Sequence, residues 1–277
     1  MGGGPCAVNP EPFADFFDCI VIGEGEEADL AVLKIVADGK EQGLSKSQIL
    51  EKAKSVQGVY VPALTAEGEG VTKAVLQDFE NAPYPTHPLV PNIEIIHDRV
   101  TLELYRGCAS GCRFCQAGFY YRPIRERSAE KCAENGKTMI ENTGFGEMSL
   151  CSLSTSDYTY LHELQAELAP FVKEKQITLA LPSLRLSSFT SDMVESSRHG
   201  SLTFAPEAGT QRLRNVINKN VSEQEIDNIG RAFAAGYDSV KLYFMIGLPT
   251  ETDEDIAGIA EICRRLRELY FEYRHKR

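Results

Sequence analysis

The chain has 277 residues, of which 43% are hydrophobic and 25% charged, and its formal net charge is −11. These values are typical of a globular protein with room for one large α/β domain and a smaller appendage. No apolar stretch is long enough to cross a bilayer, and the negative charge argues against broad, non-specific binding of nucleic acids. Eight cysteines without a secretory signal are typical of the reducing cytoplasm, where we expect this protein.

The first part of the chain, residues 1–26, contains one short apolar strand candidate, Cys19–Ile22. A strand of this length cannot fold without partner strands in a sheet, and we expect this sequence not to supply that sheet. Residues 27–94 follow as a linker with two helices, over 27–43 and 45–57, and end in a proline-rich stretch. The prolines of that stretch forbid a helix and favour an extended path, so we predict that the last domain begins at residue 95.

The third part, residues 95–277, alternates between strand and helix patterns, which indicates a parallel sheet of the α/β class. About five strands are predicted, at Thr101–Arg106, Glu147–Ser152, Thr178–Ser183, Ser201–Ala205 and Ser239–Ile246. Helices are predicted at residues 128–142, 158–174, 188–197, 209–217, 222–235 and 253–272. Functional sites in such sheets form where the strands end, at their carboxyl termini.

Three cysteines follow the first of these strands with the spacing C-x3-C-x2-C: Cys108, Cys112 and Cys115. Thiolates this close together can each hold one iron of a [4Fe–4S] cluster. No fourth cysteine lies nearby, so one iron would keep an open position for chemistry.

Two other interpretations of these cysteines stay open. A structural zinc site would need a fourth ligand with metal-site spacing, and His87 and His97 upstream lack that spacing. A disulfide is disfavoured because the remaining cysteines are scattered along the chain without a pattern.

The cysteine run Gly107–Gln116 resembles the cluster loop of the radical S-adenosylmethionine (SAM) enzymes. The resemblance implies a partial (β/α)6 barrel of the TIM type, of which about five strands are present here. It also implies that SAM binds the open iron through its methionine part and is cleaved by an electron from the cluster. A flavodoxin- or ferredoxin-like reductant protein would supply that electron.

The same resemblance assigns SAM contacts to five further residues. Glu147 would hold the amino group of SAM, and Glu207, in Glu-x-Gly followed by Asn-Lys, would hold its ribose or methionine part. Gly247 would allow close approach of the adenine, on which Ile246 packs, and Phe114 beside the cluster would contribute to adenine recognition.

Each assignment has a structural alternative. Glu147 can simply open an ordinary strand after a helix-capping glycine, and Glu207 can be a buried carboxylate paired with Arg212. Phe114 can shield the cluster from water. The hydroxyl-rich loop Ser152–Ser156, and Ser183 with Arg185, either face SAM or are ordinary polar surface.

Residues 1–26 look like the last strand of the cobalamin-binding-type domain that precedes many radical SAM cores. The Asp-x-His-x-x-Gly motif that ligates cobalt is absent, so cobalamin binding is doubtful. Because one strand of the barrel is missing as well, we expect the chain to be a fragment.

The sequence therefore predicts a radical SAM iron–sulfur enzyme whose substrate is unknown. Relatives with a similar layout suggest methyl or methylthio transfer to RNA or protein. The alternative is an iron–sulfur or zinc-binding module without catalysis. The joint presence of Glu147, Glu207 and Gly247 favours the enzyme, because a module that only holds metal needs none of them.

Overall fold

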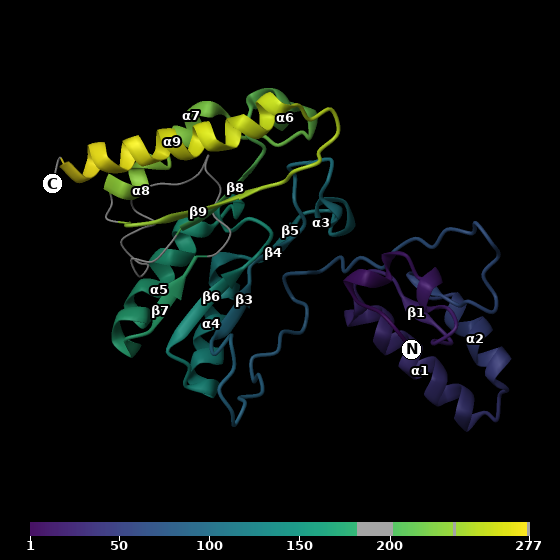
Figure 1. Ribbon diagram of the computed structural model, residues 1–277. Coiled ribbons are helices and arrows are strands. Elements are labelled where there is room, and N and C mark those ends of the chain that lie inside the picture. The colour runs from purple at the N-terminus through teal and green to yellow at the C-terminus, as the bar shows by residue number, and fades with distance from the viewer. Residues whose placement is uncertain (182–201, 235–236, 276–277) are drawn as a thin grey trace. The chain divides into compact units, whose positions relative to one another are not determined.

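The computed structural model describes residues 1–181, 202–234 and 237–275 and divides the chain into two compact units, Met1–Pro83 and Tyr84–Arg277 (Figure 1). Along the chain, the boundary between the units falls after Pro83, inside the proline-rich stretch. The predicted helix 188–197, together with Ser183 and Arg185, lies outside the described residues.

The first unit contains two strands, β1 (Ile20–Val21) and β2 (Val59–Tyr60), which pair antiparallel with Ile20 opposite Tyr60. The expectation that the strand near residue 20 has no partner in this sequence is therefore wrong. Its partner lies in the stretch between the second helix and the proline-rich segment, where periodicity gives no strand signal over two residues.

Two helices cover this ribbon, α1 (Gly25–Glu41) and α2 (Lys46–Lys54), and both were predicted. Ser45 caps α2 as expected, because its hydroxyl accepts from the backbone N–H of Gln48 while the Gln48 amide accepts from the backbone of Ser45. Two short 3-10 turns, Pro5–Val8 and Glu11–Phe13, precede the ribbon.

In the second unit, β3 (Val100–Glu103), β6 (Glu147–Cys151) and β7 (Thr178–Ala180) form a parallel sheet in the order β3-β6-β7. The helices α4 (Ala129–Thr143) and α5 (Leu161–Lys175) pack together, and α4 lies on β3 (Figure 1). The 3-10 turn Thr155–Asp157 follows β6. Leu102, Met148 and Leu150 are fully buried in this core, as expected for a parallel strand covered by helices.

The predicted strand Thr101–Arg106 is two strands. After β3 the chain turns into β4 (Tyr105–Arg106), which pairs antiparallel with β5 (Arg125–Glu126). The short helix α3 (Gln116–Tyr120) lies between them. Neither β5 nor α3 was predicted, since elements of two and five residues leave no readable period.

The second half of this unit contains the parallel pair β8 (Leu202–Glu207) and β9 (Val240–Phe244). Helices α6 (Gln211–Val216), α7 (Glu223–Asp227), α8 (Gly230–Ala234) and α9 (Asp253–His275) accompany it, and α9 contacts α7 and α8 (Figure 1).

The predicted helix 222–235 is interrupted, although Ser222 and Glu225 form a capping box at its start. Gly230 begins α8 where the chain packs tightly on α9. A Cβ on this glycine would lie 3.0 Å from the ring of Tyr273 and 3.3 Å from Leu269. Close packing between helices therefore selects the glycine, and the glycine in turn favours the break.

Across the described ranges, the second unit contains the five predicted strands in two parallel sheets, β3-β6-β7 and β8-β9. The α/β class is thereby confirmed. In the same ranges no helix is both long enough and apolar enough to cross a membrane.

Candidate cluster and cofactor site

The cysteine loop begins at Gly107, directly after β4, and the β4–β5 ribbon joins its two ends. Gly107 has a φ of 99°, and a Cβ there would lie 2.8 Å from the carbonyl oxygen of Pro123. Only glycine fits this conformation and this space. The ribbon and the glycine together fix the point at which Cys108 enters the loop.

Cys108, Cys112 and Cys115 are half-buried, and no disulfide joins any of the eight cysteines, which all lie in the described ranges. Cys115 caps α3, where its Sγ accepts from the backbone N–H of Gly118 at 3.4 Å. Arg122 Nε donates to the carbonyl of Cys108, also at 3.4 Å. The first and last cysteine of the loop are therefore hydrogen-bonded to α3 or to a residue just after it.

The three thiols are not gathered around a common point. Among the residues that the structure describes, no group of three His, Cys, Asp or Glu side chains is arranged to hold a metal ion. The donor set itself fits a [4Fe–4S] cluster with one open iron, because it offers three thiolates on one loop and no fourth cysteine beside them. The side chains would have to turn inward on binding.

The turn after α6 lies against the cysteine loop. The backbone N–H of Arg113 donates to the carbonyl of Ile217 at 3.0 Å. Asn218 Nδ2 donates to the carbonyl of Gly111 at 2.9 Å. These contacts hold the Asn-Lys pair, Asn218 and Lys219, against the cysteine loop, although no role was predicted for either residue.

Glu207 is the last residue of β8, where a positive φ of 70° turns the chain. Its carboxylate lies 3.2 Å from Lys219 Nζ, and both side chains are mostly buried, with exposures of 14% and 22%. The alternative pairing of Glu207 with Arg212 is wrong, because Arg212 binds Asp255 and the carbonyl of Thr250 instead. The structure therefore places Glu207 and the cysteine loop on either side of one short turn.

Ile246 and Gly247 follow the end of β9 beside Glu207. The N–H of Met245 donates to the carbonyl of Glu207 at 2.8 Å, and that of Gly247 donates to Glu251 Oε1 at 2.9 Å. Gly247 has a φ of 88° with open space where a side chain would stand. Ile246 and, within the cysteine loop, Phe114 expose apolar surface, at 75% and 42%.

Glu147 lies elsewhere. It is the first residue of β6, at the amino end of the strand, and its carboxylate forms an ion pair with Arg99 at 2.5 Å. The predicted strand Glu147–Ser152 begins at this residue as expected, so Glu147 lies at the end opposite to the carboxyl ends at which such sheets form their sites. The carboxyl end of β6 leads into the loop of Ser154 and Thr155, whose side chains are almost fully buried.

Asp255, at the start of α9, is a buried carboxylate that links several side chains. It accepts hydrogen bonds from the side chains of Thr210, Arg212 and Thr252. The Thr210 hydroxyl and then the Arg212 guanidinium hold the pKa of this carboxyl well below its ordinary value of 3.8. These contacts tie α9 to the segment that follows Glu207.

We expect Asp255→Asn to lower stability at neutral pH, measured as the urea midpoint. A carboxyl whose pKa is depressed by folding stabilises the fold above its unfolded pKa, and that contribution is lost as the pH falls. The difference between variant and wild type should therefore shrink below about pH 4. Asp253→Asn, at an exposed residue of the same helix turn, is the control and should leave the midpoint unchanged. If the urea midpoints of variant and wild type differed as much in acid as at neutral pH, the ionic role of Asp255 would be contradicted.

Two known protein families match this chain. The family described as "Radical SAM superfamily" matches residues 102–263, and "Radical SAM proteins, N-terminal" matches residues 1–62. The chain belongs to the radical SAM superfamily. The predicted family is confirmed.

Two similar curated proteins come from archaea. An uncharacterized protein of Methanocaldococcus jannaschii is 32% identical over 97% of this chain and 56% of its own length. An uncharacterized methyltransferase of Pyrococcus horikoshii is 21% identical over 99% of this chain and 59% of its own length. The radical SAM chain thus spans a little over half the length of these relatives.

Solved structures show the same fold. TsrM from Kitasatospora setae, a radical SAM methyltransferase solved with tryptophan and a SAM analogue, superposes with a TM-score of 0.62 at 12% identity, covering 96% of this chain and 53% of TsrM. The cobalamin-dependent SAM radical enzyme OxsB gives a TM-score of 0.62 at 15% identity, covering 98% of this chain and 41% of OxsB. These matches and the family confirm the predicted partial barrel, and the family uses the predicted cofactors, a [4Fe–4S] cluster and SAM.

Proposed function

We propose that this radical SAM chain binds a [4Fe–4S] cluster through Cys108, Cys112 and Cys115 and cleaves SAM reductively to start radical chemistry. The observation that carries the proposal is the packing of the cysteine loop on the Asn218–Lys219 turn, which places it close to Glu207. A module that only holds iron would not need a mostly buried ion pair next to the turn that packs on its cysteine loop.

Each residue of the site has a chemical task in this proposal. The carboxylate of Glu207 accepts hydrogen bonds from the ribose hydroxyls or the methionine ammonium of SAM, and Lys219 holds that carboxylate in place. The exposed apolar surfaces of Ile246 and Phe114 pack on the adenine, while Gly247 leaves room for its approach. Glu147 has no task here, because it lies at the amino end of β6.

When bound, the cluster supplies the electron that breaks a carbon–sulfur bond of SAM and gives a 5′-deoxyadenosyl radical. The chain contributes orientation and exclusion of water. The buried side chains of Ser154 and Thr155 close the carboxyl end of β6, and the half-buried cysteines limit solvent at the iron.

The reaction that follows is proposed from the relatives. One is called a methyltransferase and another, from Methanocaldococcus jannaschii, a putative methylthiotransferase, so methyl or methylthio transfer to RNA or protein is the class we propose. A flavodoxin- or ferredoxin-like protein is proposed as the reductant, in a reducing compartment such as the cytoplasm. The domain limits 1–26, 27–94 and 95–277, with a cobalamin-binding-like remnant first, stay predictions.

The test is formation of 5′-deoxyadenosine from SAM by the anaerobically reconstituted chain with dithionite. In Glu207→Gln we expect the SAM concentration for half-maximal rate to rise about tenfold or more, the loss expected for one hydrogen bond to a charged group. Glu174→Gln on the exposed face of α5 is the matched control. Cluster-loaded wild type that forms no 5′-deoxyadenosine would favour the alternative, an iron–sulfur module without catalysis.

A further inference from the structure

The turn after α6 makes an unusual contact with the cysteine loop. Asn218 adopts a φ of 54° and donates from Nδ2 to the carbonyls of Gly111, at 2.9 Å, and Ser110, at 3.4 Å. Asparagine tolerates this left-handed conformation better than most residues. That tolerance does not require contact with another loop, so the two bonds to Ser110 and Gly111 call for a separate explanation.

A buried arginine fixes the same turn from behind. Arg214 is fully buried in α6, and its guanidinium donates to the carbonyl of Ala208 at 2.9 Å and to that of Val221 at 3.0 Å. Ala208 directly follows Glu207, and Val221 lies just beyond the turn. One rigid, planar group therefore clamps both ends of the segment that carries Asn218.

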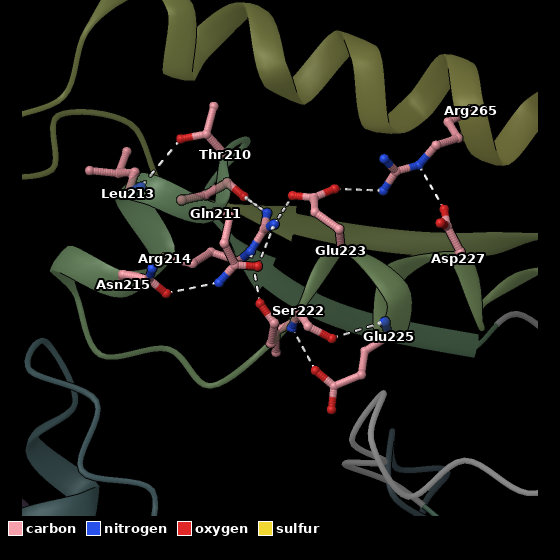
Figure 2. A network of polar contacts seen from close by, with 12 residues as sticks. Thr210, Gln211, Leu213, Arg214, Asn215, Ser222, Glu223, Glu225, Asp227 and Arg265 are labelled. Atoms are coloured by element: carbon pink, nitrogen blue, oxygen red, sulfur yellow. Dashed lines mark hydrogen bonds and ion pairs between the residues drawn. The ribbon is translucent and has the colours of Figure 1, made fainter.

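The clamp extends to α9, as Figure 2 shows. Arg214 forms an ion pair with Glu223, and the other oxygen of that carboxylate binds Arg265 at 2.8 Å. Arg265 also binds Asp227 at 2.7 Å. The buried guanidinium is thus paired on several sides, as a buried charge must be, and the turn is held by a network and not by one contact.

We propose that Asn218 is a positioning residue of the iron–sulfur site, an inference that rests on the proposed function. The two carbonyls that accept from its amide belong to Ser110 and Gly111, which lie between Cys108 and Cys112. By fixing the backbone there, the amide sets how far apart the chain holds Cys108 and Cys112. The Arg214 clamp keeps Asn218 at that distance from the loop.

The first test uses the apoprotein and needs no cofactor. Asn218→Gly tolerates the positive φ but removes both hydrogen bonds, so the loop should open more often. We expect alkylation of Cys112 by iodoacetamide, followed by mass spectrometry, to accelerate about tenfold, as expected for the loss of two ordinary hydrogen bonds. Cys263, exposed on α9, is the internal reference and should react at an unchanged rate. Asn215→Asp, on the exposed side of α6, is the matched control variant.

The second test uses the reconstituted protein. Asn218→Asp keeps the shape and the tolerance of positive φ but places carboxylate oxygens against two carbonyl oxygens and adds a negative charge near the cluster. We expect a more negative midpoint potential of the cluster and about tenfold weaker binding of SAM. The neutral Asn218→Gly should weaken SAM binding without the same shift in potential.

Unchanged alkylation of Cys112 in Asn218→Gly would overturn the inference, and so would wild-type SAM affinity in both variants. If Asn218→Asp fails to retain iron, Asn218→Gly still tests the inference through the alkylation rate of Cys112 and the affinity for SAM. The proposed function can fail separately. Wild-type protein that binds no cluster would overturn it, while faster alkylation in the glycine variant would still show that Asn218 holds the loop.

Discussion

Cys112→Ser is expected to abolish assembly of the [4Fe–4S] cluster. The loop offers only three thiolates, and two of them cannot hold a four-iron cube whose remaining irons lack protein ligands. A serine hydroxyl stays protonated at neutral pH and is a poor ligand for iron. The variant should retain little iron and sulfide after anaerobic reconstitution and lose the broad visible absorption of the cluster.

Cys263→Ser is the matched control, because Cys263 is exposed on α9 and far along the chain from the loop. It should retain as much iron as wild type. Circular dichroism should show that both variants are folded, since Cys112 is half-buried and contributes little packing. Full iron content in Cys112→Ser would mean that other residues supply the ligands, and the assignment of the loop would then be wrong.

Gly209→Ala is expected to lower the free energy of unfolding by about 3 kcal/mol. Gly209 follows Glu207 by two residues and lies against the backbone of α9. A Cβ there would lie 2.3 Å from the carbonyl oxygen of Asp255 and 2.5 Å from the nitrogen of Ile259. Backbone atoms of a helix cannot rotate away as a side chain can, so α9 would have to move as a body.

Gly146→Ala is the control, because a Cβ at Gly146 would meet no atom within 4 Å. Chemical denaturation of the two variants should differ clearly, with the loss confined to Gly209→Ala. The same variant should also weaken SAM binding, since a displaced α9 disturbs the segment after Glu207. Equal stability of the two variants would show that α9 is not packed on Gly209 as described.

Local chemistry made most of the fold predictable. Ser45 and Ser222 open helices with capping boxes, and hydrophobic periodicity locates α4, α5 and α9. The elements that were missed are short ones, β2, β5 and α3. β2 exists because it pairs with β1, and β5 because the chain returns along β4 to close the cysteine loop; such long-range pairing leaves no local pattern.

The candidate site was predictable only in part. The cysteines, Glu207 and Gly247 follow from motifs, and the structure places their segments near one another through Asn218 and Lys219. Arg212 was the alternative partner considered for Glu207, but it forms an ion pair with Asp255 at the start of α9 instead. Glu147 received a SAM contact only from the family motif, although the sequence already predicts it at the start of its strand, where the structure has it.

Electron paramagnetic resonance of the anaerobically reconstituted, dithionite-reduced chain, with and without SAM, tests whether SAM binds at the cluster. We expect the signal of a reduced [4Fe–4S] cluster that changes when SAM is added, because SAM then binds the iron that Cys108, Cys112 and Cys115 leave open. A cluster signal indifferent to SAM would contradict the enzymatic proposal and favour an iron–sulfur module. Zinc in place of iron, with no cluster signal, would contradict the assignment of the cysteines themselves.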